Sequence, residues 1–500
     1  MTSLTSIARA LAVRDHAAQR ITTVRHTHIS SRPLVFIPLT LAGEANAPLA
    51  AMVGDRPDAP RLFVVPQPRN RDQRFAFAAE LGRFVMSYVD SFARRQEEVP
   101  GGRGRESRQR FTDAPQLLVP NPGGIGFVRL FGRSTRLRRT YGPYAVDRVV
   151  PLFGQWLTWF SERAEYPGSS MLLAMTSVLG AHWATGQSAV EDANLAALLA
   201  WLDPPAGRSP FDAALDAEDP EIWPPAGPTT DPTFDAERLA PAINRYARTD
   251  GDPVARQQAL SRLEAILATQ LEPTWRLMWK GVELLNGLTP GASVVERWAQ
   301  DRDEYTKYVT YLRDGTALPQ ARRDNAVAAA RRLSRLERAQ AAYDAQRALD
   351  DPLVMAEYRL TGEAFAGTVV HAEPNRVDAS GTRRVLRPHI TVRTQDPLRL
   401  GAGVTVQSPA RAGQKADIVA VTPTEDGSDV LLELTGGMGR SLTPPPGSVP
   451  AEGEWITYST ISDEFQRTGQ FPDVDDTPWT HGGPPAPPEP TEEDAAEDWS

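Results

Sequence analysis

The chain has 500 residues, of which 41% are hydrophobic and 23% are charged, and its formal net charge is −9. This composition is typical of globular proteins, and the length predicts about three domains. Because cysteine is absent, the sequence excludes disulfide scaffolds, thiolate metal sites and cysteine nucleophiles, and it fits a reducing cytosol. No stretch approaches the roughly 18 apolar residues of a membrane span, so we expect a cytoplasmic protein that does not enter a membrane.

The basic residues are almost all arginine, since lysine occurs only at Lys280, Lys307 and Lys415. This bias, together with abundant Ala and Pro, is typical of a GC-rich bacterial genome. No acid stands two residues before any of the three lysines, which excludes the metal-dependent nuclease motif that ends in Asp/Glu-x-Lys. The Gly-x-Ser-x-Gly elbow of hydrolases and the His-Glu-x-x-His helix of zinc proteases are also absent. We therefore favour a non-enzymatic protein, and we assign no catalytic residue, metal ligand or cofactor.

Residues 1–143 are predicted to form an α/β amino-terminal domain. An amphipathic helix is expected at 5–21, and short apolar runs bounded by Gly, Pro and Asp predict buried strands at 34–41, 49–53 and 62–65. Apolar residues then recur at helical spacing from Phe75 to Phe92. His26 and His28 lie in a β-branched stretch, and because no further ligand stands nearby we interpret them as the polar face of a strand.

An arginine-rich region follows in the same domain. Between Arg94 and Arg139 there are eleven Arg and four acids, in a polar loop and in two expected strands, 116–119 and 125–131. Guanidinium groups can bind phosphates, and the nearby rings of Phe127, Phe131 and Tyr141 could stack on bases. The candidate nucleic-acid-binding residues are Arg103, Arg105, Arg129, Arg133, Arg136, Arg138, Arg139 and Tyr141. The alternative is a solvated loop in an arginine-biased protein.

The middle of the chain, 144–320, is predicted to be an α-helical domain. Its tryptophans recur among aliphatic residues at spacings of three and four, which favours a helical core. Pro-rich residues 203–232 are expected to form a linker or an extended surface loop. The later helices are separated by Pro and Gly, where helices usually stop.

Residues 321–360 are predicted to form a long helical arm. The stretch 321–349 contains no Gly or Pro and should be a helix of about 40 Å, at 1.5 Å per residue. Its apolar seam is narrow, with Leu333, Leu336, Tyr343 and Leu349, and most of the remaining surface is basic. Such a seam favours an arm or a coiled-coil contact over a core helix.

Residues 361–460 change to the period of two that strands show. Five or six short strands with Gly, Asp and Pro between them predict a small β-barrel of the SH3 or OB type. Residues 461–500 are expected to form a disordered acidic tail, because 471–500 holds nine acids and no Lys or Arg. The overall prediction is therefore an α+β multidomain protein.

The arm followed by the barrel, 321–458, resembles the stalk helix and 1B barrel of superfamily 1 helicases, of the Upf1-like and Dna2-like groups. In that family the barrel touches nucleic acid or gates its channel beside the motor domains. The motor is missing here, because the nearest approach to G-x-x-x-x-G-K-[ST] is residues 436–441, with Arg440 in place of the lysine. The resemblance thus implies a partner or degenerate relative of such a motor.

These observations predict a scaffold or nucleic-acid-associating accessory subunit of a bacterial cytoplasmic assembly. Its expected partners are DNA or RNA and a separate helicase, ATPase or nuclease. One alternative is an enzyme without a linear motif, with its site in the amino-terminal domain. Another is a purely protein-binding component that uses the acidic tail to recruit a basic partner.

Overall fold

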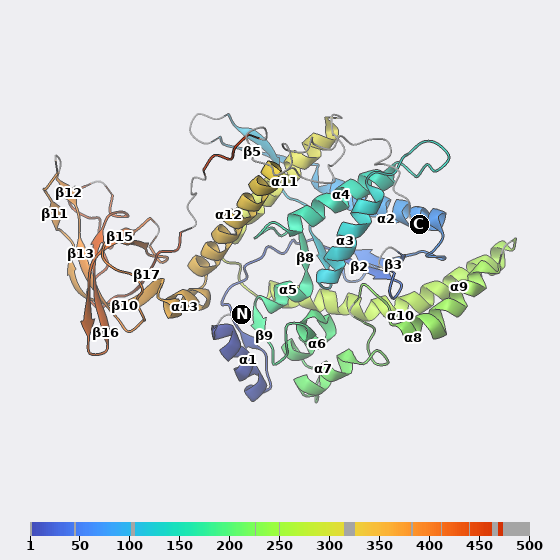
Figure 1. Cartoon of the computed structure of the whole chain (residues 1–500), viewed down its shortest axis with the longest axis horizontal. Helices are drawn as coiled ribbons and strands as arrows, with labels where there is room; N and C mark the ends of the chain where they lie inside the picture. Colours follow the sequence, from blue (N-terminus) through green and yellow to red (C-terminus); the bar gives the residue numbers. More distant parts are fainter. Residues whose placement is uncertain are drawn as a thin grey trace, which may run out of the picture.

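The structure is a computed structural model that describes residues 3–44, 47–101, 106–225, 227–249, 251–314, 326–381, 384–411, 413–439, 441–462 and 469–473. It has a mixed α/β body and a β-barrel that projects from one side of it (Figure 1). Of the predicted site residues, Arg103 and Arg105 lie outside the described residues, as does most of the acidic tail.

A five-stranded sheet forms the centre of the body. Its order is β4-β3-β2-β7-β8, in which β2, β7 and β8 are parallel and β3 and β4 antiparallel. The strands are β2 (Leu34–Thr40), β3 (Pro48–Gly54), β4 (Arg61–Val64), β7 (Leu117–Val119) and β8 (Leu172–Ala174). Every residue of β2 and β3 is buried, which is why these strands read as continuous apolar runs.

Helices cover both faces of this sheet, and the side chains of β2 alternate between two cores. Leu34 and Phe36 point toward one core, and Val35 and Ile37 toward the other. The first core is built with α2 (Arg71–Phe92), α3 (Pro122–Thr135), α4 (Val149–Ala164) and α11 (Val294–Arg313). The second is built with α5 (Met175–Gly180), α6 (Leu195–Leu202), α9 (Ala240–Ala247) and α10 (Pro253–Asn286). The body is therefore a three-layer arrangement.

Residues on either side of position 143 share the first core. A Cβ on Gly132 of α3 would lie 2.8 Å from the backbone nitrogen of Thr158 on α4. A Cβ on Gly154 of α4 would lie 2.3 Å from the backbone nitrogen of Arg136. Strand β8, from the stretch in which we expected only helices, is an edge strand of the central sheet. The sheet and the middle helices thus pack as one body.

The expected strand at 125–131 is wrong, because these residues belong to α3. Asn121 caps the helix, with its side-chain oxygen accepting a hydrogen bond from the Gly124 amide at 3.3 Å, and Pro122 occupies the first turn. Gly124 is required where the helix passes β7, since a Cβ there would lie 2.7 Å from the side chain of Val119. Close packing on the strand outweighs the low helix propensity of glycine.

Small elements complete the body. Helix α1 (Ser3–Asp15) is followed by β1 (Gln19–Arg20), which pairs with β9 (Trp183–Ala184), and a hairpin joins β5 (Gln96–Val99) to β6 (Arg108–Phe111). The Pro-rich stretch contains α7 (Pro210–Glu218) and α8 (Pro232–Phe234), and short 3-10 and π segments occupy Glu191–Ala193 and Asp235–Leu239. No helix in the described ranges combines the length and apolar character needed to cross a bilayer.

The arm and the barrel follow in the predicted order. The arm is α12 (Ala326–Asp350), and a separate short helix, α13 (Pro352–Thr361), leads into the barrel. The prediction of a small barrel is confirmed, since six strands close in the order β10-β13-β16-β15-β14-β17. They are β10 (Ala364–Glu373), β13 (His389–Thr394), β14 (Thr405–Gln407), β15 (Lys415–Thr424), β16 (Gly427–Leu434) and β17 (Trp455–Ser459), with a hairpin of β11 (Val377–Asp378) and β12 (Val385–Leu386) at one end.

Candidate functional site

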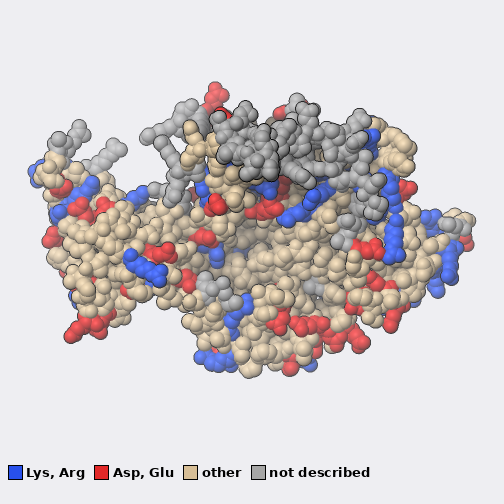
Figure 2. Space-filling view, in the orientation of Figure 1, with Lys and Arg blue, Asp and Glu red and all other residues tan. Residues whose placement is uncertain are grey.

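The candidate site is a surface formed by the start of α2, the exposed side of α3 and the loop 136–148. We call it the Arg surface. It contains six of the eight residues predicted from the sequence, and the fold adds residues from α2 and a second tyrosine. Its members are Arg71, Arg74, Arg129, Arg133, Arg136, Arg138, Arg139, Tyr141 and Tyr144. On the face shown in Figure 2, Lys and Arg side chains gather on the α2 side of the body.

The ring of Phe75 lies at the centre of this surface. The guanidinium carbon of Arg71 lies 4.8 Å from its centroid, and that of Arg138 lies 5.5 Å from it. Arg71 also lies 5.6 Å from the ring of Tyr144 and donates to the Tyr144 carbonyl at 2.7 Å. Two arginines from separate elements are therefore held against one aromatic side chain, each within the range of a cation–π contact.

The loop 136–148 is fixed at both ends. Its start continues α3, with the amide of Arg138 bonded to the Thr135 carbonyl at 3.1 Å and the Arg138 Nε donating to the Ser134 carbonyl at 2.9 Å. Its end is anchored by Val146, which is buried and donates its amide to the Arg139 carbonyl at 2.9 Å. The loop therefore presents Tyr141 and Tyr144 outward, with 65% and 75% of each residue exposed.

Two of the rings expected to stack on bases are not available. Phe127 and Phe131 are each 5% exposed and pack in the first core, so their predicted role is wrong. On a helix, residues four apart lie on the same side, and this side of α3 faces the sheet. The opposite side of the same helix carries Arg129 and Arg133, which are exposed.

The charged groups of the Arg surface interact with one another and with nearby carboxylates. The pKa of Arg74 is lowered, first by partial burial and then by the neighbouring charge of Arg71, with Glu44 opposing the shift. Arg71 has an adjacent carboxylate in Asp72 at 2.9 Å, and Arg129 contacts Glu165 at 2.7 Å. The backbone of Arg136 continues the end of α3, and its side chain is half-buried at the base of the surface.

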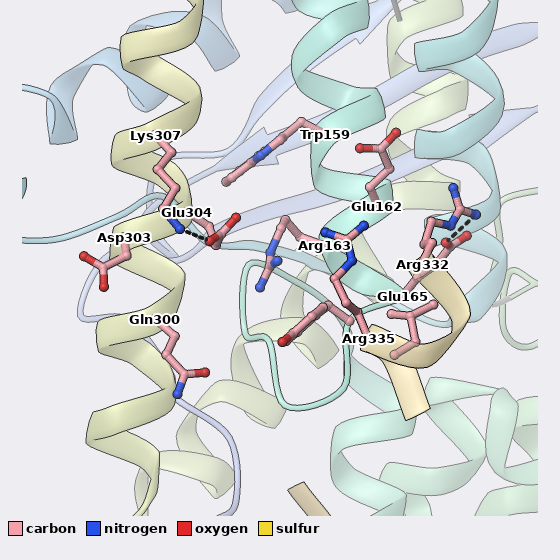
Figure 3. Close-up of a pocket in the computed structure, with 12 residues that line it drawn as sticks. Trp159, Glu162, Arg163, Glu165, Gln300, Asp303, Glu304, Lys307, Arg332 and Arg335 are labelled. Atoms are coloured by element: carbon pink, nitrogen blue, oxygen red, sulfur yellow. Dashed lines mark hydrogen bonds and ion pairs between the residues drawn. The ribbon is translucent and has the colours of Figure 1, made fainter. Parts of the chain in front are cut away.

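A cleft of about 570 Å³ lies next to the Arg surface, between α4, α11 and α12 (Figure 3). Its acidic lining residues come from α4 and α11, and two arginines of the arm, Arg332 and Arg335, lie opposite them. Trp159 forms one wall, with its ring stacked on Tyr308 at a centroid distance of 5.1 Å. The acids lining the cleft are Glu162, Glu165, Asp303 and Glu304, and the bases are Arg163, Lys307, Arg332 and Arg335.

The carboxyl edge of the parallel strands is covered by the chain itself. Open α/β sheets usually bind ligands at this edge, where strand order changes direction. Here the Thr40 amide donates to the Pro228 carbonyl at 2.6 Å, and the Asn121 side chain donates to the Gly227 carbonyl at 3.0 Å. A Cβ on Gly123, at the start of α3, would lie 2.8 Å from Pro228. The described residues at this edge thus pack on one another.

A second cluster of ionisable groups is fully buried at the junction of the body, the arm and α13. Asp351 caps α13 and also accepts hydrogen bonds from the Thr23 amide at 2.7 Å and the Thr23 hydroxyl at 3.0 Å. The Nε2 atom of His26 lies 3.3 Å from the same carboxylate. Burial alone would raise the pKa of Asp351, but the contacts with His26, Leu353 and Thr23 together hold it well below its ordinary value. This carboxylate joins segments more than 300 residues apart.

His182 completes the junction as a neutral side chain. Its Nε2 accepts a hydrogen bond from the His26 amide at 3.0 Å, and its Nδ1 lies 2.7 Å from the Val178 carbonyl, to which it donates. Burial lowers the pKa of His182 to about 4, with the Val178 carbonyl opposing the shift. The interpretation of His26 as a polar strand face is wrong, because it is a buried loop residue, 2% exposed. Within the described ranges, no three His, Asp or Glu side chains form a group that could hold a metal ion.

No protein-family model, no curated protein and no solved structure matches this chain.

The sequence reasoning missed Arg71, Arg74 and Phe75, which the fold brings against the loop 136–148. The available signal was the run of arginines from Arg69 to Arg74 directly before an amphipathic helix. It also missed Glu165, for which the sequence gives no signal, since its contacts come from distant helices.

The buried histidines predict that acid destabilises the body. Burial lowers the pKa of His28 to about 4, as it does for His182, so the unfolded chain binds more protons between about pH 6.5 and pH 4. The contribution of these histidines to the free energy of unfolding is therefore fully present above the pKa of the unfolded state. It is lost as the pH falls through this window. We expect the free energy of unfolding to decrease by roughly 2 kcal/mol per histidine between pH 7 and pH 5, measured by urea denaturation. The variant His28→Gln should lose about half of this dependence, and a constant wild-type value would contradict the assignment.

Proposed function

We propose that this protein is a non-enzymatic scaffold that binds DNA or RNA through the Arg surface. In this proposal it is an accessory subunit of a bacterial cytoplasmic assembly that contains a separate helicase, ATPase or nuclease. The observation that carries the proposal is the placement of Arg71 and Arg138 against one ring, Phe75, with Tyr141 and Tyr144 exposed beside them.

The charge arrangement supports an anionic ligand. Like charges on neighbouring elements repel each other by roughly 1 kcal/mol at close range in water, and a cation–π contact offsets about the same amount. A second guanidinium group at the same ring therefore adds little stability through that ring contact. A phosphate backbone would gain from both guanidinium groups, since they are already oriented and lose little conformational entropy on binding.

The exposed tyrosines support a ligand that has bases as well as phosphates. A protein surface that binds a single strand combines cationic groups with rings on which bases stack. Tyr141 and Tyr144 are held by a loop whose ends are hydrogen-bonded to the body. Their rings are accessible, whereas Phe127 and Phe131 are buried in the core.

A groove between α1 and α13 favours protein binding as a second function. It has a volume of about 730 Å³, and its lining combines polar and charged residues with apolar ones, among them Ile7 and Leu353. These two residues are 54% and 40% exposed, although they are large and apolar. Such a groove near the start of the barrel is suited to a partner subunit, while recruitment through the acidic tail stays a prediction from the sequence.

The first test is the triple charge reversal Arg133→Glu, Arg138→Glu, Arg139→Glu. We expect the wild-type protein to bind labelled 30-nucleotide DNA and RNA in fluorescence polarisation at low salt. The triple variant should lose at least about tenfold in affinity, and its salt slope should decrease by about two to three, since each phosphate contact contributes roughly 0.7–0.9. The triple reversal Arg245→Glu, Arg248→Glu, Arg262→Glu at exposed positions of α9, its carboxyl-terminal cap and α10, in the opposite helical layer, is the matched control. Absence of wild-type binding, or equal loss in the control, would overturn the proposal.

The second test removes the rings with Tyr141→Ala, Tyr144→Ala. Loss of stacking should weaken binding of single strands by at least about thirtyfold, because each of the two stacked bases contributes roughly 1–3 kcal/mol. Binding of a duplex should change less than about twofold, since its bases are already stacked and its phosphates still meet the arginines. Equal effects on both ligands, measured in the same polarisation assay, would assign the tyrosines a structural role.

A further inference from the structure

Glu165 stands between the Arg surface and the arm. It caps the carboxyl end of α4 and lines the cleft. Its Oε1 atom lies 2.7 Å from Arg129 of α3, and its Oε2 atom lies 3.7 Å from Arg332 of α12. Two arginines that lie about 200 residues apart in the sequence thus share one carboxylate.

The two ends of the arm are attached to the body in different ways. At its carboxyl end, Gln346 accepts from Arg297 at 2.7 Å, and Asp350 accepts from the amide and hydroxyl of Ser293, each at 3.0 Å. The ring of Tyr343 lies 5.1 Å from the Arg297 guanidinium. Several short hydrogen bonds therefore fix this end of the arm to the body.

The amino-terminal half of the arm is mostly exposed. Residues 329–333 are exposed, and Leu333, from the expected apolar seam, is 57% exposed. Arg332 and Arg335 face the acids of α4 and α11 across the cleft (Figure 3), and Leu336 also lines it. Val327 is buried in this half, but most of its other side chains are exposed, and the ion pairs across the cleft are of the exposed kind that is weak and screened by salt.

We propose that Glu165 competes with nucleic acid for Arg129 and Arg332, so that a bound strand takes both guanidinium groups and releases the amino-terminal half of α12 from the cleft. This inference rests on the proposed function of the Arg surface. A phosphate is the natural competitor, because it offers a guanidinium the same two-oxygen partner as a carboxylate, and a strand offers several of them. The carboxyl end of the arm stays in place and acts as the pivot.

Binding of the strand and release of the arm are thermodynamically coupled. Whatever weakens the contact of Glu165 with the arm must strengthen binding of the strand, and a bound strand must shift the arm toward the released position. The affected region is the amino-terminal half of α12, while α13 and the barrel remain attached through Asp351.

The test replaces the carboxylate by a nearly isosteric amide, Glu165→Gln. We expect this variant to bind the 30-nucleotide DNA about three- to tenfold more tightly than the wild type at 50 mM NaCl, with a salt slope steeper by about one. The matched control is Glu304→Gln, which removes the same charge from the same cleft. In the wild type, Glu304 pairs with Lys307 and not with an arginine of the arm. The control should change affinity by less than about twofold.

Arm position is measured independently by spin labels. The chain has no cysteine, so Ser261→Cys on α10 and Ala329→Cys on α12 give a single labelled pair at exposed helical positions. We expect one distance distribution without DNA and a longer, broader one with DNA, and Glu165→Gln should show part of this change without ligand.

The outcomes separate the two proposals. If the wild type binds DNA but Glu165→Gln behaves as Glu304→Gln, or if DNA leaves the distance unchanged, the role of Glu165 is overturned and the Arg surface stands. If the wild type does not bind DNA or RNA at 50 mM NaCl, the Arg surface is overturned, and the competition with it.

Discussion

Burial of the central sheet on both faces is the constraint on which the rest of the structure depends. Strands β2 and β3 have no exposed residue, so two helical layers are required to cover them. The first layer places α2 beside α3, with Phe77 and Phe131 in contact at a centroid distance of 6.1 Å. This packing brings the start of α2 to the end of α3, and it is the reason that Arg71 and Arg138 meet at Phe75.

The placement of the barrel depends on a different interaction, the burial of Asp351. A carboxylate without partners would be costly at this depth, but here it accepts from Thr23 and Leu353 and contacts His26. It therefore fixes the first turn of α13 to the amino-terminal segment. Beyond that turn, Arg359 of α13 pairs with Asp396 at 2.7 and 2.9 Å, and Asp396 also accepts the amide of Ala366 in β10. Two carboxylates in series thus orient the barrel on the body.

Periodicity in the sequence predicted the elements whose packing is local. The buried runs at 34–41 and 49–53, the helix that ends at Phe92 and the six barrel strands all carry their own pattern. It failed at 125–131, because the glycines that flank this apolar run, Gly124 and Gly132, are explained only by close contacts with β7 and α4. Close approach between elements leaves no local pattern, so α3 could not be distinguished from a strand by spacing alone.

The candidate site was predictable only in part, for the same reason. A count of arginines located the segment that ends at Arg139, but it could not separate the exposed side of α3 from the side that buries Phe127 and Phe131. Helical periodicity makes that separation once the segment is known to be a helix. Arg71 and Glu165 lie outside the segment and join the site through tertiary contacts alone. Counting residue types therefore locates the arginine-rich segment, but tertiary contacts determine which of its side chains lie on the same surface.

Arginine in this protein has two roles, and the partners of each guanidinium distinguish them. Arg163 and Arg297 are largely buried, and each bonds to a specific acceptor: Arg163 to the Asp301 carboxylate at 3.1 Å, and Arg297 to Gln346 and the His26 carbonyl. Truncation there would leave buried acceptors unsatisfied, so these arginines hold the fold together. Arg71 and Arg138 also donate to backbone carbonyls, but their guanidinium groups share a ring near the surface instead of lying deep in the body. Two guanidinium groups held at one ring are what an anionic chain could use, and this placement is the reason for proposing the Arg surface, and not the buried junction, as the binding site.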